Sequence, residues 1–367
     1  MPAMLKDAVP FDQVRRALVI KLRHHGDVLL SAPVLSALQA QAPQTEIDAL
    51  VYGETAEMLS GHPALSQLHL IEHGWRKLGT FGRLGAEWGL VQRLKARQYD
   101  LVIHLTEDWR GAWLCRLLGP RWSVAPKTGG RGKLWANSFT HFYSGTRGNP
   151  RHTVEANLDS LRRLGLQPTP AQRRVTLVPG REAEARVILM LRDKGLEPGR
   201  YAHIHAPSRW QFKCWTSEGW GAVVRELKAS GLPVVLTAAP GESEGRIVAD
   251  ILAASGGAAV SLAGQLSLKE MAALSARAKL FLGVDSAPMH IAAAMDTPVV
   301  ALFGPSGERH WGPWANSGDD RHIVVASDRH SCRPCGIDGC GGSKISDCLV
   351  QLPAERVIKA AHTLLAR

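Results

Sequence analysis

The sequence lacks any uninterrupted apolar run of the roughly 18 residues that a membrane-spanning helix needs. Its first residues, MPAMLKDAVPFDQVRRALVIKLRHHGD, place acids and arginines where a secretory signal has its apolar region. We therefore expect the protein to stay in the cytoplasm.

Two common active-site fingerprints are also missing. The first expected strand is not followed by G-x-G-x-x-G, and the chain has no G-x-x-x-x-G-K-[ST]. These absences remove the main support for a nicotinamide dehydrogenase or a P-loop kinase.

Cysteine is scarce, with 6 residues among 367. Cys115 and Cys214 stand alone, as small buried cysteines do. The other four occupy the segment CRPCGIDGCGGSKISDC: Cys332, Cys335, Cys340 and Cys348. Their first pair has zinc-ligand spacing but their second pair does not, so zinc and reduced structural thiols both remain open, and we assign these cysteines neither a metal nor a catalytic role.

The charge of the chain is uneven. Of a net +11, residues 1–175 carry 23 Lys and Arg against 14 Asp and Glu, or +9, which leaves +2 for the remainder. This excess of positive charge predicts that the first half binds an acidic partner: nucleic acid, anionic lipid or a phosphorylated glycan. Solvated surface charge is the alternative interpretation.

The hydrophobic pattern predicts an α/β protein of two domains, since 367 residues exceed what one core usually supports. Strand-like runs, separated by stretches of helical spacing, predict parallel sheets with helices on both faces. We expect strands at 17–22, 47–52, 68–71 and 101–105, and at 201–205, 233–238, 259–262, 280–284 and 299–303. The proline-containing stretch LQPTPAQRRVTLV, residues 166–178, is the expected linker. The predicted boundaries are 1–172 and 173–350, followed by a C-terminal helix in 351–367.

Several helices carry their own signals. TSEGWGAVVRELKASG has an apolar face and ends at Gly231, and Ser267 with Glu270 has the spacing of a capping box. In the C-terminal segment, Val357, Ala361 and Leu364 share one face with Ile358. Amphipathic packing of this last helix is all that the pattern itself predicts.

The segment FLGVDSAPMHIAAAMDTPVVALFGPS, residues 281–306, predicts a buried strand, a helix near 289–295 and a second strand. Pro288 suits the first turn of the helix, where its missing N–H has no partner to lose. A helix N-terminus of this kind offers backbone N–H groups and a positive dipole end to an anion. We therefore expect an anionic ligand at this junction.

Three segments together resemble the ADP-heptose lipopolysaccharide heptosyltransferases: KLRHHGDVLLSAPVLSALQAQAP, HAPSRWQFKCW and GVDSAPMHIAAAMDTPVVALFGP. The RHHGD turn, FKCW and the cysteine segment look most similar to the third heptosyltransferases, which add a branch heptose to the inner core. The resemblance implies the GT-B fold, two Rossmann-like domains facing a cleft, with the acceptor on the first domain and the ADP-sugar on the second. It also implies inverting transfer without a metal or cofactor, and a terminal helix that can return to the first domain.

The resemblance assigns roles residue by residue. Asp27, in the Gly-Asp turn, takes the position of the catalytic base, and Lys213 takes that of the phosphate-binding lysine. The other donor-binding positions are Ser208, Glu244 for the ribose, Leu266 against adenine, Asp285 for the heptose hydroxyls, Ser286, Ala287 and His290. From the residues alone, helix capping by Asp27, Asp285 or Ser286 is the competing interpretation.

The implied acceptor is a phosphorylated lipopolysaccharide core at the inner leaflet of the inner membrane, with nucleic acid excluded. Arg23 and the KTGGRGK loop, with Lys127, Arg131 and Lys133, are the expected phosphate contacts. The alternatives are the first or second heptosyltransferase of the family, a sugar-nucleotide-binding protein without catalysis, a nucleic-acid-binding module, and an enzyme of the same architecture with another reaction, such as an epimerase.

Overall fold

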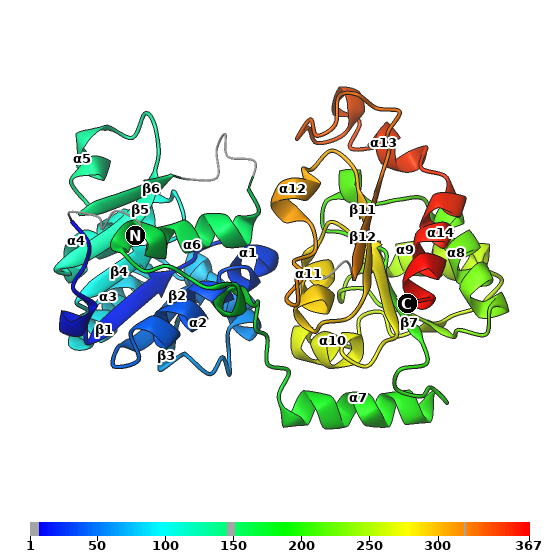
Figure 1. The fold of residues 1–367 in the computed structure, drawn as a ribbon, viewed down its shortest axis with the longest axis horizontal. Coiled ribbons are helices and arrows are strands. Elements are labelled where there is room, and N and C mark those ends of the chain that lie inside the picture. The colour runs from blue at the N-terminus through cyan, green and yellow to red at the C-terminus, as the bar shows by residue number, and fades with distance from the viewer. Residues whose placement is uncertain (1–6, 145–150, 319–320) are drawn as a thin grey trace. The chain divides into compact units, whose positions relative to one another are not determined.

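A computed structural model of the chain describes residues 7–144, 151–318 and 321–367 (Figure 1). The chain divides into two compact units, of which the first unit is Met1–Thr176 and the second unit is Leu177–Arg367. Within the described residues, each unit is built around one six-stranded parallel sheet.

The first unit has the strand order β3-β2-β1-β4-β5-β6. Its strands are β1 (Arg16–Ile20), β2 (Glu46–Tyr52), β3 (Gln67–Ile71), β4 (Leu101–His104), β5 (Trp122–Lys127) and β6 (His141–Ser144). Its helices are α1 (His25–Leu29), α2 (Ala32–Gln41), α3 (Thr80–Ala96), α4 (Trp109–Leu118), α5 (Gly132–Ala136) and α6 (Thr153–Leu164), with 3-10 turns η1 (Phe11–Gln13), η2 (Gly53–Met58), η3 (His73–Lys77) and η4 (Pro170–Arg173).

The second unit has the strand order β12-β11-β10-β7-β8-β9. Its strands are β7 (Ala202–His205), β8 (Val234–Leu236), β9 (Val260–Ser261), β10 (Leu280–Val284), β11 (Val299–Phe303) and β12 (His322–Ala326). Its helices are α7 (Arg181–Asp193), α8 (Ser217–Ala229), α9 (Glu242–Ala254), α10 (Leu268–Ser275), α11 (Ala287–Ala294), α12 (Glu308–Trp311), α13 (Asp347–Val350) and α14 (Ala354–Leu365), with 3-10 turns η5 (Gln211–Lys213) and η6 (Cys340–Gly342).

Both sheets follow the same path when their strands are numbered from the start of each unit, namely 3-2-1-4-5-6. In each, the first and fourth strands lie side by side and parallel, β1 with β4 and β7 with β10. Successive strands are added toward one edge of the sheet up to the third strand and toward the other edge from the fourth, and such sheets bind ligands at the carboxyl ends of the strands where this order switches. The fold therefore predicts one binding region in each unit.

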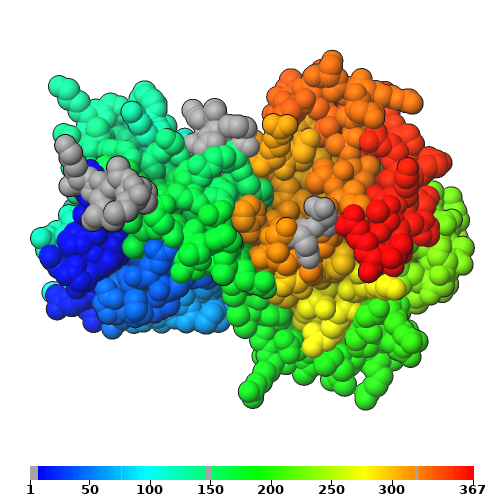
Figure 2. Space-filling view, in the orientation of Figure 1, coloured from blue at the N-terminus to red at the C-terminus, as the bar shows by residue number. Residues whose placement is uncertain are grey.

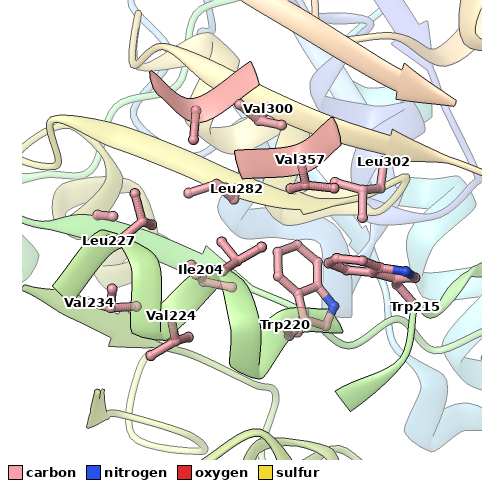
Figure 3. Packing of buried hydrophobic residues seen from close by; sticks show 14 of the residues in the cluster. Ile204, Trp215, Trp220, Val224, Leu227, Val234, Leu282, Val300, Leu302 and Val357 are labelled. Carbon is pink, nitrogen blue, oxygen red and sulfur yellow. The ribbon is translucent and has the colours of Figure 1, made fainter. Parts of the chain in front are cut away.

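The core of the second unit shows why its helices form where they do. Trp215 and Trp220 pack edge to face with their ring centroids 5.1 Å apart (Figure 3). Trp220 and its helix α8 lie against Ile204 of β7 and Leu282 of β10 in one buried cluster. Burying one large apolar side chain stabilises a fold by roughly 1.5–3 kcal/mol, so this face holds α8 on the sheet.

The C-terminal helix α14 packs within the second unit. Val357, Ala361 and Leu364 are buried in the same cluster as Trp220, and α14 contacts α8, β10, β11 and β12. In Figure 2 the red atoms of the C-terminal segment adjoin orange and yellow-green atoms of this unit. The apolar face of this helix is thus buried on the second sheet, and a contact with the first domain, which the resemblance implied, stays a prediction.

The nine strands expected from the sequence are all present, within one or two residues at their ends. Three more were not anticipated: β5, β6 and β12. β5 carries Pro126, and β6 and β12 are edge strands of four and five residues, so their hydrophobic patterns are weak. Among the described residues, no helix has the length and apolarity to cross a bilayer.

Candidate active site

The junction between β10 and α11 lies at the carboxyl end of the fourth strand of the second unit. Ser286 is the N-cap residue of α11, and its hydroxyl bonds to the Val284 carbonyl (3.3 Å) rather than to the helix. Pro288 lies in the first turn, as expected. Pro288 has no N–H and the Met289 N–H donates to the Ser286 carbonyl (3.1 Å), so the Ala287 N–H is the group of this first turn from which an anion can accept.

Lys213 and Asp285 meet at this junction although they are 72 residues apart. Lys213 ends η5, which follows β7, and its Nζ donates to Asp285 Oδ2 at 2.6 Å. Asp285 is 6% exposed and Lys213 is 21% exposed at its side chain. The carboxylate is thus held by an ion pair and does not cap α11, and the two residues assigned to donor binding form one charged pair.

The remaining donor-binding candidates also belong to the second unit. Ser208 is half-buried, and its hydroxyl accepts from the Trp210 N–H (3.3 Å). Glu244, in the first turn of α9, accepts from the Ala239 N–H (2.8 Å). Leu266 packs on an apolar cluster that includes Leu262, and His290 is buried in α11. These four residues occupy the loops and first turns that follow β7, β8, β9 and β10.

Asp27 follows β1, the first strand of the first unit, as Ser208 and Lys213 follow β7, the first strand of the second unit. Helix α1 begins at His25 with His24 as the N-cap residue, so Asp27 is in the first turn and is not the cap. It is partly exposed, just after β1. A carboxylate here is reachable by a substrate, as a general base must be.

A buried lysine near Asp27 was not identified from the sequence. Lys21, the residue after β1, is 5% exposed, and its Nζ donates to the Leu105 carbonyl (3.1 Å) and to Asn157 Oδ1 (3.2 Å). Burial lowers the pKa of Lys21, whereas the nearby carboxylates of Asp27 and Asp108 oppose this shift. Each unit therefore places a lysine after its first strand within electrostatic reach of an aspartate after its fourth strand.

The loop after β4 adds a second group that the sequence did not reveal. His104 is fully buried, and burial lowers its pKa to about 4. Its Nε2 lies 3.3 Å from the Asp108 carbonyl, and Thr106 donates its hydroxyl to the Asp108 carboxylate. Asp108 also caps α4 by accepting from the Gly111 N–H (2.9 Å). These two hydrogen bonds fix the orientation of the Asp108 carboxylate, which lies within electrostatic reach of Lys21.

The basic residues expected to bind acceptor phosphates differ in their surroundings. Arg131 donates to the Glu107 carbonyl (2.6 Å) and lies over the rings of Trp109 and Trp135, at 5.8 and 5.3 Å from their centroids. Arg23, Lys127 and Lys133 are exposed. The carbonyl and the two aromatic faces therefore preorganise the guanidinium of Arg131.

A pocket of about 230 Å³ opens within the first unit next to Asp108. Its lining combines cations, carboxylates and aromatic rings: Tyr52, Ile71, Glu72, His73, Trp75, Arg83, Glu87, Asp108 and Arg110. Arg110 is paired with Glu87 across the pocket wall. Alternating charges beside aromatic faces are suited to a polar ring with hydroxyl or phosphate substituents.

The cysteine segment of residues 332–348 is mostly exposed, and only Cys348 of its four thiols is buried. Burial raises the pKa of the Cys348 thiol, Arg333 opposes this shift, and the other three thiols add to it. In the part of the chain that the structure describes, no three His, Cys, Asp or Glu side chains are arranged to hold a metal ion.

The two parallel sheets, each with the strand order 3-2-1-4-5-6, have the GT-B fold of solved glycosyltransferases. The structure of the E. coli ADP-heptose heptosyltransferase II superimposes with a TM-score of 0.73 at 21% identity, covering 96% of this chain and 98% of that one. An E. coli heptosyltransferase solved with ADP gives 0.72 at 22% identity, covering 95% and 99%. A family 9 glycosyltransferase from Veillonella parvula gives 0.82 at 22% identity, covering 98% and 99%.

The chain belongs to glycosyltransferase family 9, the heptosyltransferases, whose family model matches residues 88–339. It is similar to lipopolysaccharide heptosyltransferase 3 of E. coli strain K12, with 36% identity over 348 residues that cover 94% of this chain and 96% of the relative. It is also 28% identical to lipopolysaccharide heptosyltransferase 1 of Pseudomonas aeruginosa over 327 residues, 87% of this chain and 86% of the relative. The family confirms the resemblance found in the sequence.

Proposed function

We propose that the protein transfers a heptose from ADP-L-glycero-D-manno-heptose to a heptose of the lipopolysaccharide inner core, with inversion, as a third heptosyltransferase. The observation that carries this proposal is the charged geometry at the same strand ends of both units, Asp27 in one and the Lys213–Asp285 pair in the other. The 36% identity to heptosyltransferase 3 supports this member over the first and second.

In the proposed reaction, Asp27 accepts the proton of an acceptor hydroxyl as its oxygen attacks the anomeric carbon. The bond from that carbon to the β-phosphate oxygen breaks, its electron pair stays on the diphosphate, and ADP leaves. A positioned carboxylate contributes about 10²–10⁴ in rate as a general base.

The second unit would bind the donor. The leaving diphosphate gains negative charge, which Lys213, Ser286 and the Ala287 N–H at the start of α11 would stabilise. Asp285 would accept hydrogen bonds from the heptose hydroxyls, while Ser208, Glu244, Leu266 and His290 complete the site. The ion pair between Lys213 and Asp285 supports these roles, because it brings the two groups together at the carboxyl ends of β7 and β10.

The first unit would bind the acceptor, a phosphorylated core on its lipid anchor. The pocket beside Asp108 and the held guanidinium of Arg131 support this assignment, because they lie on the loops after β2, β3, β4 and β5, at the same sheet edge as Asp27. Arg23, Lys127 and Lys133 would add mobile cations. We propose that the enzyme works in the cytoplasm, at the inner face of the inner membrane.

The test is ADP release from ADP-heptose with phosphorylated and unphosphorylated heptose-containing cores as acceptors. For Asp27→Asn we expect acceptor-dependent release to fall about 10²–10⁴-fold with donor binding unchanged. Asp12→Asn, an exposed aspartate of the same unit, is the matched control and should keep full activity. Donor binding without release on either acceptor would instead favour the sugar-nucleotide-binding alternative.

A further inference from the structure

Half of the large apolar side chains that are exposed among the described residues come from one stretch of the first unit. Of the fourteen large hydrophobic side chains exposed among the described residues, seven lie between positions 78 and 134. They come from the end of η3 and from α3, α4 and α5: Leu78, Phe81, Leu84, Trp88, Trp113, Leu117 and Leu134. Phe81 is 91% exposed, so its ring has almost no protein partner. A cluster of this kind marks an interaction surface rather than scattered surface apolarity.

Helix α3 carries the centre of this surface. Phe81, Leu84 and Trp88 are spaced i, i+3 and i+7 along it, so they share one face. The carboxyl half of α3 packs through Leu90 and Leu94 onto the core of the unit, whereas residues 80–85 are all exposed. A groove of about 790 Å³, lined by β3 and by Gly85 and Gly89, separates this helix from the edge strand. The amino half of α3 therefore projects from the unit.

Helix α4 lies beside α3 and extends the same surface. The two helices are in contact, and Arg110 of α4 pairs with Glu87 of α3. Trp113 and Leu117 of α4 are 52% and 44% exposed. Two tryptophans, Trp88 and Trp113, thus stand on neighbouring helices, and tryptophan is the side chain enriched where hydrocarbon meets water.

The charge of this stretch selects the partner. Residues 78–117 carry six Lys and Arg against four Asp and Glu, a net charge of +2, and the flanking residues 73–77 and 118–134 add six more cations and no acids. Lys77, Arg83, Arg93 and Lys95 lie on η3 and α3 themselves, and all four are exposed. A soluble protein partner would need a matching acidic and apolar face, whereas an anionic bilayer supplies both properties at any point of its surface.

We propose that the α3–α4 surface, residues 78–117, docks the enzyme on an anionic membrane, with Phe81, Leu84 and Trp88 entering the interfacial layer. The flanking lysines and arginines would lie at the level of the lipid phosphates, where their stems also contact apolar groups. This inference rests on the proposed function in one respect, since a lipid-anchored acceptor is what makes membrane docking useful.

The experiment compares vesicle binding of the full chain and of Phe81→Glu/Leu84→Glu, by sedimentation with phosphatidylglycerol–phosphatidylcholine vesicles. The double variant should bind the anionic vesicles at least about tenfold more weakly. Ile188→Glu/Leu189→Glu, which changes two exposed apolar residues of α7, is the matched control and should bind as the native protein does. Unchanged melting temperatures would establish that both variants fold, as the exposure of all four residues predicts.

A second arm separates docking from catalysis. With a deacylated, water-soluble core acceptor, both double variants should release ADP as the native protein does; with the same core embedded in vesicles, only Phe81→Glu/Leu84→Glu should lose activity. Vesicle binding that the α3 substitutions leave intact would overturn the inference. So would a native dimer that these substitutions convert to a monomer without any vesicle binding, because a second copy would then cover the surface. Failure of the native protein on the soluble acceptor would instead overturn the proposed function.

Discussion

At the scale of single residues, the Lys213–Asp285 pair is the contact that most directly links fold and chemistry. It joins the loops after the first and fourth strands of one sheet, and its carboxylate is almost fully buried. A charge taken out of water this far depends on its partner, because an uncompensated buried charge is strongly unfavourable. The pair therefore both stabilises the junction and arranges two functional groups.

We predict that Lys213→Met and Asp285→Asn have different effects on ligand binding. Lys213→Met should weaken ADP binding about tenfold or more through loss of its charge-assisted contact with the diphosphate. Asp285→Asn should weaken ADP-heptose binding more than ADP binding, because its proposed contacts are with the sugar. Calorimetric titration of both ligands measures this difference. Equal losses for ADP and ADP-heptose in Asp285→Asn would contradict the assigned role.

The two variants also permit a stability test. Groups in direct contact usually show coupling of about 0.5–3 kcal/mol in a double-mutant cycle. We expect a coupling in this range for the free energy of unfolding, measured by urea titration of the native chain, the single variants and the double variant. Additive effects would mean that the 2.6 Å contact contributes no net stability.

A second prediction at this scale concerns pH. His203 and His205 are buried, and burial lowers their pKa values to about 3 and about 4. Thr237 Oγ1 lies 2.8 Å from His203 Nε2 and 2.9 Å from His205 Nδ1, an arrangement that neutral rings satisfy. Because the unfolded rings gain protons near pH 6.5 and the folded rings do not, stability should be complete above pH 6.5 and fall toward pH 4.

The expected slope is up to about 1.4 kcal/mol per pH unit for each such histidine. Melting temperature measured between pH 7.5 and 4.5 should show the fall, and His205→Gln should make it shallower by removing one titrating group. A variant with the same pH slope as the native chain would assign the loss of stability to other groups.

At the scale of elements, two glycines on neighbouring helices should respond oppositely to the same change. A Cβ added to Gly221 in α8 would meet backbone and side-chain atoms of Ala254 at 2.7–3.1 Å, at the end of α9, whereas one added to Gly245 in α9 would meet nothing within 4 Å. Gly221→Ala should therefore cost about 1–3 kcal/mol by forcing the helices apart. Gly245→Ala should stabilise by about 0.5–1 kcal/mol through helix propensity. Urea unfolding measures both, and a stabilising Gly221→Ala would show that α8 and α9 shift freely.

Elements with a strong local signal were the ones that the sequence could predict. The β10–α11–β11 segment has a buried strand, a proline in the first turn and a second buried strand, and its strands were predicted to the residue. The Ser267–Glu270 capping box is present. β6 and β12 were missed because they are short edge strands with weak hydrophobic patterns, and β5, which lies between β4 and β6, was missed because it contains a proline.

The site divides in the same way. Asp27, Lys213 and Asp285 each lie in a short local motif, so a resemblance between sequences could single them out as candidates. That Lys213 and Asp285 form an ion pair is visible only in the structure. The burial of Lys21 and the pocket beside Asp108 depend on side chains contributed by several segments, which no single window of sequence contains. Such tertiary features become visible only when the sheet places the segments together.

At the scale of the whole molecule, every residue proposed to bind the donor belongs to the second unit. We predict that ADP slows amide hydrogen exchange around residues 206–217 and 285–295 and leaves residues 7–144 unchanged, because binding raises the free energy of local opening only where contacts form. Mass spectrometry measures the amide exchange of each segment with and without ADP. Lys213→Met, which should bind ADP more weakly, is the control and should show less protection at the same ADP concentration. Protection by ADP in the first unit would show that the nucleotide contacts both units.

The shared strand order of the two units has a consequence for how the molecule tolerates change. In both units a lysine after the first strand lies within electrostatic reach of an aspartate after the fourth strand. The sheets fix where the strands end, whereas the side chains at those ends come from loops, which accept substitution and insertion more readily than strands do. Loops can therefore be exchanged in one unit while the sheet and core of the other stay as they are.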